Sequence, residues 1–180
     1  QYFGLDYYKT AVKLYDSKPE VYGNAQHLPF AEGCAETVAL LEVLEHLPNP
    51  NAAIAEAHRV LKNGGALIVT VPFLYPIHDA PFDFHRWTKY GLHELFSRHG
   101  FSLIQDGYRG KPSETAALLC NIAATKQFLN LCAGYNPLVI IAFPLLALFI
   151  PLINAFGWFF SFFGGEDELM PFGYHAILRK

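Results

Sequence analysis

Charged residues and cysteines are both scarce in this chain of 180 residues. Only 16% of the residues are charged, the formal net charge is −3, and lysine and arginine form no block. Proteins that bind nucleic acid need a basic surface, so we expect no nucleic-acid partner. The three cysteines form no CxxC pair and are odd in number, which suggests neither a disulfide framework nor a cysteine-bound zinc site.

The opening residues, QYFGLDYY, lack the basic segment followed by an apolar one that marks a signal peptide. Together with the cysteine pattern, this favours a reducing, cytoplasmic location. Apolar residues, by contrast, are abundant. They make up 52% of the chain, enough for one domain with a substantial core.

The most informative stretch is 36–50, ETVALLEVLEHLPNP. Residues 37–41 (TVALL) form a short apolar run, which predicts a strand buried on both faces of a parallel sheet. Glu42, Glu45 and His46 follow directly. Ligands of open α/β sheets bind beyond the carboxyl ends of the strands, so this acidic turn is a candidate site.

Strand and helix patterns alternate along the first 71 residues. This alternation predicts an α/β fold, a parallel sheet with crossover helices. Strands are expected at 2–5, 21–22, 37–41 and 66–71. The expected helices are a stretch with Tyr8, Ala11, Val12 and Tyr15 on one face, and 50–62, which Asn49 caps and a left-handed turn at 63–65 ends. Beyond residue 87 the patterns predict a helix from Thr88 to Gly100, a strand at 101–104, a helix at 113–133 and a last strand at 173–178.

A long loop, 72–87 (PFLYPIHDAPFDFHRW), follows the strand at 66–71. It leaves the carboxyl end of that strand, so it belongs on the same rim of the sheet as 42–46. Its polar residues are His78, Asp79, Asp83, His85 and Arg86.

The segment 137–163 carries no charged residue over 27 positions, long enough to cross a bilayer. A single crossing would separate the last strand from the rest of the sheet. We therefore expect the segment to associate with a membrane, where it either enters and returns or lies in the interface, as a bent pair of short helices split near Pro151. The alternative is a soluble apolar lid or a dimer face.

Four pieces of the sequence resemble one known family. NAQHLPF (24–30), AETV (35–38), EVLEHL (42–47) and HRVLKNGG (58–65) stand in the order and spacing of class I S-adenosylmethionine-dependent methyltransferases. The segment 82–101 also looks like one found in many members, so the resemblance covers about 1–110 and the last strand. It implies a Rossmann-like, doubly wound, mostly parallel sheet of seven strands whose last strand is antiparallel. The apolar insertion is not part of the common pattern.

The resemblance also implies where S-adenosylmethionine binds. Asp6 matches the acid whose carboxylate accepts hydrogen bonds from both ribose hydroxyls, which suits a group with two acceptor oxygens. The alternative for Asp6 is a helix cap. Asn24, in place of the usual Asp, and Ala25 match the pair at the adenine edge, and Leu41 and Glu42 lie beside the cofactor.

The family's glycine-rich loop after its first strand has no match in this sequence. The chain also opens on what should be the second strand. We interpret it as lacking its N-terminal portion, and expect the chain as given to bind the cofactor poorly or not at all.

Methyl transfer depends on positioning and, for a hydroxyl acceptor, on a general base. The candidates on the rim are His46, His78, Asp83 and His85. For each histidine the alternative is a structural hydrogen bond in the loop, and Arg86 has the alternative of pairing with Asp83 or Asp79 instead of a substrate.

Glu42, Glu45 and His46 also match a Glu-x-x-Glu-His pattern that some family members use to bind a divalent metal. Carboxylates with one imidazole could hold magnesium, manganese or zinc, and His78 or His85 would be the natural further ligand. The alternative is that no metal binds and that the Glu42 side chain turns to solvent.

The sequence thus predicts a methyltransferase core at 1–112, a helical insertion at 113–170 and a closing strand at 171–180. The expected function is methyl transfer from S-adenosylmethionine to a small acceptor, lipid-like or quinone-like, drawn from the bilayer. One rival is a non-catalytic, membrane-associated protein that retains the fold. The other is a nucleotide-dependent oxidoreductase, since Asp6 would serve a dinucleotide ribose equally well, although EVLEHL and NAQHLPF speak against it.

Overall fold

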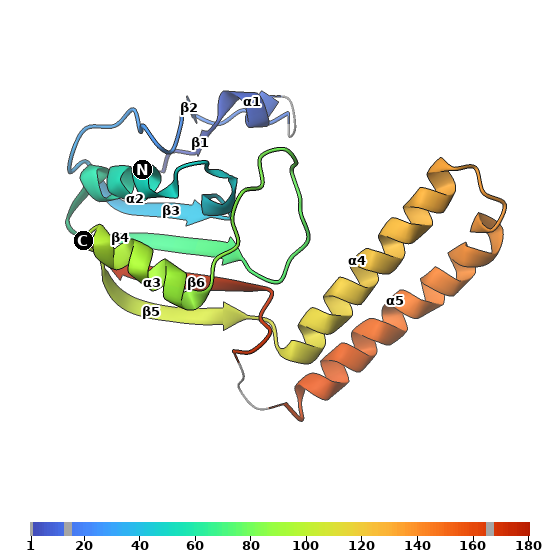
Figure 1. Cartoon of the computed structure of the whole chain (residues 1–180). Helices are drawn as coiled ribbons and strands as arrows, with labels where there is room; N and C mark the ends of the chain where they lie inside the picture. The colour runs from blue at the N-terminus through green and yellow to red at the C-terminus, as the bar shows by residue number, and fades with distance from the viewer. Residues whose placement is uncertain (1, 13–15, 165–167) are drawn as a thin grey trace. The chain divides into compact units, whose positions relative to one another are not determined.

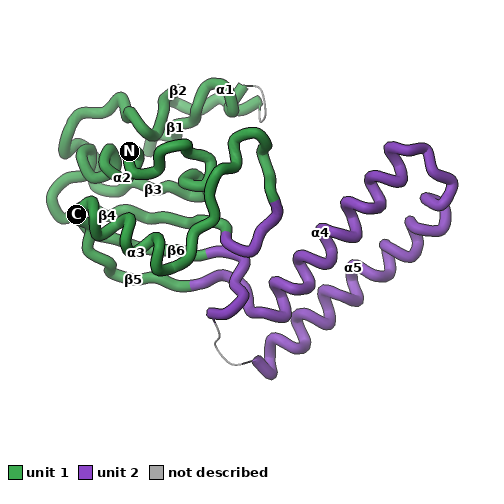
Figure 2. The backbone as a smooth tube through the Cα atoms, viewed as in Figure 1, with its two compact units in different colours: residues 1–72, 77–107, 174–180 green, residues 73–76, 108–173 purple. Residues whose placement is uncertain are grey.

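Two units make up the structure, a computed structural model that describes residues 2–12, 16–164 and 168–180 (Figure 2). Unit 1 comprises Gln1–Pro72, Ile77–Gly107 and Tyr174–Lys180, and unit 2 comprises Phe73–Pro76 and Tyr108–Gly173. Tyr15, expected on the first helix, lies outside the described residues.

The sheets of unit 1 have the predicted α/β character (Figure 1). One sheet pairs β1 (Leu5–Asp6) in parallel with β2 (Val21–Tyr22). The other has the order β3-β4-β6-β5. Its strands are β3 (Ala35–Leu41), β4 (Leu61–Pro72), β5 (Ser102–Arg109) and β6 (Gly173–Arg179).

The four-stranded sheet combines parallel and antiparallel neighbours. β3 and β4 are parallel, with Thr37 opposite Ala66 and Leu41 opposite Thr70. β6, the last strand in the chain, lies between β4 and β5. The backbone of Lys180, just past the end of β6, exchanges hydrogen bonds of 3.1 and 3.0 Å with Gly64 and Gly65, near the start of β4, so β6 is antiparallel. The predicted Rossmann-like fold with an antiparallel last strand is confirmed.

Helices α2 (Pro50–Val60) and α3 (Lys89–Arg98) supply much of the core of unit 1. α2 starts as predicted, with the Asn49 side chain accepting a hydrogen bond from the Ala52 N–H at 3.3 Å. Thr88 caps α3 in the same way through Gly91, at 3.1 Å. Apolar side chains of these helices and of the sheet are buried: Ile54, Ala57, Val60, Leu67, Val69, Val71, Leu92, Leu95, Phe96, Ala176 and Leu178.

Two local predictions in unit 1 are wrong. The apolar run in β3 is not buried on both faces, because β3 is an edge strand of its sheet, and Leu41 is 56% exposed. The turn at 63–65 does not cap α2. That helix already ends at Val60, since the fully buried Leu61 is extended and begins β4. Gly64 keeps the left-handed φ of +76° inside β4, where the register with β3 shifts.

Unit 2 contains a pair of antiparallel helices, α4 (Pro112–Ala133) and α5 (Val139–Ser161). The Ser113 hydroxyl donates to the Gly157 carbonyl at 2.9 Å, and the Asn121 amide donates to the Asn154 side chain at 2.7 Å. The expected split near Pro151 is wrong: α5 is one helix of 23 residues with Pro144 and Pro151 inside it. Each proline removes one N–H from the helix, and α4 packs alongside and holds the neighbouring turns in place.

α5 is the one described helix that is long and apolar enough to cross a membrane. The mean hydropathy of its most apolar 18-residue window is 2.5, and none of that window is buried. Its exposed side chains include Ile140, Leu145, Leu148, Leu152 and Phe156.

Candidate functional site

The candidate site begins where β3 ends. The Glu42 N–H donates to the Thr70 carbonyl of β4 at 3.0 Å, and Glu42 has a φ of +53°, which is uncommon outside glycine. The chain turns there into a short 3₁₀ helix, η2 (Leu44–His46), and Leu44 and Glu45 become fully buried. The turn therefore points one carboxylate into the protein.

The loop after β4 folds against this turn, on the rim where the sequence predicted it. The Phe84 and His85 N–H groups both donate to the Glu45 carbonyl, at 2.8 and 3.2 Å. The His46 Nδ1 lies 2.7 Å from the Phe82 carbonyl oxygen. Backbone groups of the two segments thus fix η2 and the loop to each other.

The Glu45 carboxylate has no exposed surface, and neither of its oxygens has a hydrogen-bond partner among the described residues. Desolvation raises the pKa of this carboxyl to about 7. The nearby charge of Glu42 acts in the same direction, whereas His78 and Arg86 oppose it. A buried polar group without a partner costs free energy, so native proteins rarely keep one without a reason.

Two histidines lie beside Glu45. The His46 and His78 rings meet edge to face, with centroids 4.9 Å apart. The His46 Nε2 lies 3.7 Å from a Glu45 oxygen and 3.9 Å from a carboxylate oxygen of Asp79. Glu45, His46 and His78 each offer one ligand atom, and these three atoms lie within 4.8 Å of one another. We call these three residues the Glu45 cluster.

Asp83 and Arg86 form an ion pair next to the Glu45 cluster. Arg86 donates to both Asp83 oxygens, one of them at 2.7 Å, and the Asp83 side chain is only 2% exposed. Arg86 therefore lowers the pKa of Asp83 to about 2. Asp83 also accepts the His78 backbone N–H at 2.9 Å, so the pair shapes the loop, as the alternative for Arg86 expected.

Glu42 and His85, two other candidates on the rim, lie outside the Glu45 cluster. The described side chains that meet as possible metal ligands include Glu45 and His46 of the predicted trio, with His78 and not Glu42 as the third. The His85 ring lies tilted beside Trp87, with centroids 5.4 Å apart, and its buried Nε2 has no hydrogen-bond partner among the described residues.

The cofactor-binding candidates lie on β1 and in the loop after β2. Asp6 ends β1, and its Oδ1 accepts from the Tyr7 N–H at 2.7 Å and from the Thr10 hydroxyl at 3.2 Å. The Asn24 Oδ1 accepts from the Gln26 N–H at 2.9 Å, and Ala25 follows in the same turn. A carboxylate or amide oxygen has two lone pairs. Among the described residues, the Asp6 Oδ2 accepts only from the Ser17 hydroxyl, at 3.2 Å, and has room for a ribose hydroxyl, whereas the Asn24 Oδ1 also accepts from the Gln26 side-chain amide, at 3.3 Å. The Asp6 acceptor therefore fits the ribose of S-adenosylmethionine in chemical kind.

Sequence reasoning missed the contact that holds the loop at 24–30. Glu56 accepts the Leu28 N–H at 2.7 Å and binds Arg59 through two nitrogens, at 2.7 and 2.8 Å. Arg59 in turn donates to the carbonyls of Leu28 and Phe30. The spacing of three residues between Glu56 and Arg59 on one helix was the available signal.

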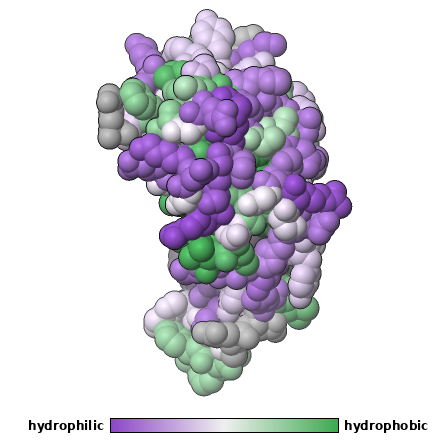
Figure 3. Space-filling model, turned by 90° about the vertical axis from the view of Figure 1, so that its left-hand side faces the viewer, coloured by the Kyte–Doolittle hydropathy of each residue, from purple (hydrophilic) through white to green (hydrophobic). Residues whose placement is uncertain are grey.

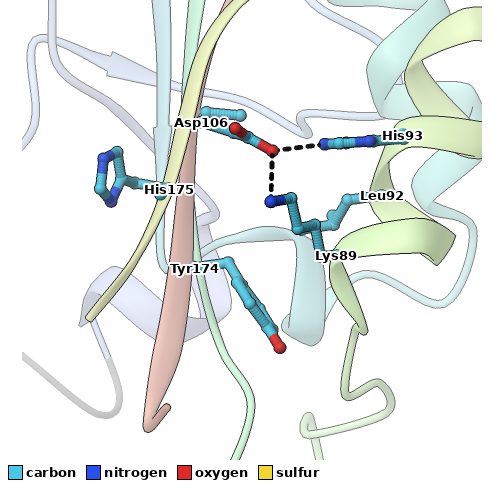
Figure 4. Close-up of a pocket in the computed structure, with 8 residues that line it drawn as sticks. Lys89, Leu92, His93, Asp106, Tyr174 and His175 are labelled. Atoms are coloured by element: carbon cyan, nitrogen blue, oxygen red, sulfur yellow. Dashed lines mark hydrogen bonds and ion pairs between the residues drawn. The ribbon is translucent and has the colours of Figure 1, made fainter. Parts of the chain in front are cut away.

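A second polar group missed in the sequence lies between α3 and β5 (Figure 4). The His93 Nε2 lies 2.7 Å from the Asp106 carboxylate, and the Lys89 Nζ lies 3.5 Å from it. Figure 4 shows His175 on the other side of the strands from this group. The adjoining cavity is about 10 Å³, room for no more than one water, so it is not a small-molecule site.

Comparison with known proteins agrees with this fold. A family model described as "Methyltransferase domain" matches residues 1–69. A ubiquinone/menaquinone biosynthesis C-methyltransferase, UbiE, of Rhizobium johnstonii is 36% identical over 74 residues, which is 38% of this chain and 29% of that protein. A probable S-adenosylmethionine-dependent methyltransferase of Mycolicibacterium smegmatis is 27% identical over 135 residues, 57% of this chain and 52% of that protein.

Among solved structures, a SAM-dependent methyltransferase from Archaeoglobus fulgidus superposes with a TM-score of 0.55 at 13% identity. The match covers 98% of this chain and 75% of that one, and at this identity it shows the fold alone.

The sequence match at 1–69 and the sheet order both support the likeness to class I S-adenosylmethionine-dependent methyltransferases. The resemblance seen in the sequence is thereby confirmed. The chain spans about half or less of the length of the two curated relatives described above.

Proposed function

We propose that this chain is part of an S-adenosylmethionine-dependent methyltransferase that acts on a small, apolar acceptor, quinone-like or lipid-like, at a membrane. One observation carries the proposal: a chain whose residues 1–69 match the methyltransferase domain also bears α5, an exposed apolar helix. The UbiE relatives, which are named as C-methyltransferases of ubiquinone and menaquinone biosynthesis, support this class of acceptor.

The cofactor supplies an electrophilic methyl group on a sulfonium. In this chain Asp6 would bind the ribose hydroxyls, and Asn24 with Ala25 would bind the adenine edge. Leu41 is exposed at the end of β3 and offers an apolar surface beside Glu42, which the Thr70 carbonyl holds in a turned conformation. These residues bind and orient, which is the larger part of what methyl transfer needs.

We assign the removal of a proton from the acceptor to side chains on the rim of the sheet. Asp83 is a poor base, because Arg86 keeps its pKa at about 2, so we assign it to positioning His78. His46, His78 and His85 are the candidate groups that contact the acceptor or the ion that activates it.

The helices α4 and α5 would bring the protein to its acceptor. α5 has 23 residues and α4 has 22, which gives lengths of about 35 and 33 Å, and a bilayer core is about 30 Å thick. The hairpin leaves the sheet after β5 and returns at β6, so it can enter a bilayer while both strands stay on one side. Small and polar contacts between the helices, such as Ser113 with Gly157, are typical of helices packed in lipid.

The hydropathy of the surface differs from one part of the chain to another. The face in Figure 3 is mainly hydrophilic, with smaller hydrophobic areas. Large exposed apolar side chains are concentrated instead between residues 138 and 163.

The first experiment titrates S-adenosylhomocysteine into the full-length protein by calorimetry. We expect binding that Asp6→Asn weakens at least about tenfold, while Asp16→Asn, a matched exposed carboxylate nearby, leaves it unchanged. If the full-length protein does not bind S-adenosylhomocysteine, the proposed activity is wrong, and a non-catalytic protein that retains the fold is the better description.

The second experiment measures co-sedimentation with phosphatidylcholine vesicles. Ile140, Leu145, Leu148 and Leu152, each at least 59% exposed, are replaced by two lysines and two glutamates, which keeps the net charge. Each charge costs about 2.5–3.5 kcal/mol at the centre of a membrane helix, so the variant should stay in the supernatant. The control replaces Ile77 and Tyr90 of unit 1, equally exposed apolar residues, with glutamine and should sediment like the parent. Equal sedimentation of all three proteins would refute the membrane role.

A further inference from the structure

Glu45 is a buried ionisable side chain, and neither of its carboxylate oxygens has a hydrogen-bond partner among the described residues. A carboxylate in that position costs free energy unless it is protonated or meets a cation. Among the described residues no lysine or arginine is paired with it, and its ionic contact is with His46, at 3.7 Å. The site therefore has a buried acceptor that no described residue fully satisfies.

The neighbours of Glu45 are metal-ligating residues. His46 and His78 each bring one ligand atom within 4.8 Å of the others in the cluster. Two imidazoles and one carboxylate form the ligand set of three-residue catalytic zinc sites, in which a further position stays open for water or substrate. We propose that Glu45, His46 and His78 bind a divalent transition-metal ion of the zinc class.

The groups behind the two histidines suit this role. The His46 Nδ1 lies 2.7 Å from the Phe82 carbonyl, so this nitrogen carries the proton, and Nε2, on the side of Glu45, keeps its lone pair. The His78 Nδ1 lies 3.4 Å from the Asp83 carboxylate and 3.5 Å from Arg86. Once His78 binds a metal through Nε2, its Nδ1 proton faces Asp83, the carboxylate–histidine–metal arrangement that fixes a ligand ring.

The Glu45 cluster differs from the three ligands that the sequence suggested, because His78 takes the place of Glu42. The change makes the ligand set richer in nitrogen, which favours zinc or cobalt over magnesium and manganese. Its open position would take water or an oxygen of the acceptor. Metal binding is measured without cofactor or acceptor, so failure of the metal site can be distinguished from failure of the proposed methyl transfer.

The test titrates cobalt(II) into the metal-free, untagged full-length protein and follows its visible absorption, with zinc competition read by calorimetry. We expect one ion per chain and intense bands of a site with low coordination number. Glu45→Gln, His46→Gln and His78→Gln should each weaken binding by more than about 100-fold, and Asp83→Asn by about 10–100-fold, as for removal of a group that orients a ligand.

His27→Gln and His93→Gln, two histidines outside the Glu45 cluster, serve as controls and should bind cobalt like the parent. Glu45→Gln keeps the size of the side chain and removes a buried charge, so circular dichroism should show a folded protein. Unchanged binding in Glu45→Gln, or equal losses in the controls, would mean an adventitious ion and would overturn the site. A parent protein that takes up no cobalt or zinc would overturn it as well.

Discussion

The two units of the molecule treat apolar and charged groups in opposite ways. Unit 1 buries the apolar side chains of α2, β4 and α3, and buries the Glu45 carboxylate as well. In unit 2, α5 buries only Gly157 and Ser161 and leaves most of its aliphatic and aromatic side chains exposed. Unit 1 has its own core and holds a buried carboxylate with no hydrogen-bond partner among the described residues, whereas the exposed apolar surface of α5 is the basis of the membrane role proposed above.

The largest effect that tests this difference is expected when one phenylalanine of each unit is replaced with alanine. Phe96 is 1% exposed, so Phe96→Ala should lower the free energy of unfolding by about 3–5 kcal/mol. Phe163 is 73% exposed, so Phe163→Ala should change it by less than about 0.5 kcal/mol in water. Urea unfolding followed by Trp87 fluorescence, in a Trp158→Phe background, reports on unit 1.

Equal losses from the two substitutions would show that residue 163 is also packed in solution. The comparison between a self-sufficient unit and an exposed hairpin would then fail.

The next test concerns how closely the two helices of unit 2 approach. A Cβ on Gly157 would lie 2.7 Å from the Ala117 Cβ and 3.0 Å from the Ser113 carbonyl oxygen. Gly157→Leu should therefore push α5 away from α4 at a cost of about 1–3 kcal/mol. Hydrogen exchange of α4 and α5 in detergent micelles measures the loss.

Gly164→Leu is the matched control, because the nearest atom to its Cβ is 3.8 Å away. A Gly157→Leu protein with unchanged exchange in both helices would mean that the close contact adds nothing to the hairpin.

The sequence was enough to predict the fold of unit 1 and the rim that carries the site. Short apolar runs alternating with helical patterns identify the strands, and chain order alone brings 42–46 and 77–87 to one edge. The antiparallel last strand came from the family resemblance. These features depend on local pattern and connectivity, which a sequence displays directly.

The sequence could not predict features that depend on which neighbour is present. The letters TVALL read as a buried strand, yet β3 lies at a sheet edge. Pro144 and Pro151 predict a break, yet α5 continues through both prolines as one helix beside α4. The burial of Glu45, and not Glu42, follows from the direction of one 3₁₀ turn. Each of these is decided by tertiary context.

A smaller effect is expected at the clamp of unit 1 that holds the loop at 24–30. Arg59→Lys keeps the charge but loses the paired hydrogen bonds to Glu56 and the carbonyls of Leu28 and Phe30. The side chains are partly exposed, so we expect a small loss of stability, together with weaker binding of S-adenosylhomocysteine, because Asn24 lies in the loop that the clamp holds. Arg98→Lys, an exposed arginine of α3, is the control.

The clamp also has a pH signature. Arg59 and the Leu28 N–H lower the pKa of Glu56 below its usual 4.5. A lowered pKa in the folded state means that the stabilisation is complete above pH 4.5 and is lost as the pH falls through the folded value. The difference in stability between the parent and Glu56→Gln should therefore shrink below pH 4.5, and a difference that grows in acid would contradict the assignment.

The smallest predicted effect lies on the apolar side of the comparison. Asn121 donates to Asn154 at 2.7 Å, and no described residue forms a hydrogen bond with the buried side-chain carbonyl oxygen of Asn121. Asn154→Leu should cost about 0.6 kcal/mol in micelles, since it leaves a second polar atom of Asn121 unpaired. The double variant Asn121→Leu/Asn154→Leu removes both partners and should recover that loss, because a hydrogen bond replaced by apolar groups of similar size is nearly neutral. Steric trapping or reversible unfolding in micelles measures the difference, and a double variant less stable than the single one would show that the polar pair, rather than apolar packing, holds α4 against α5.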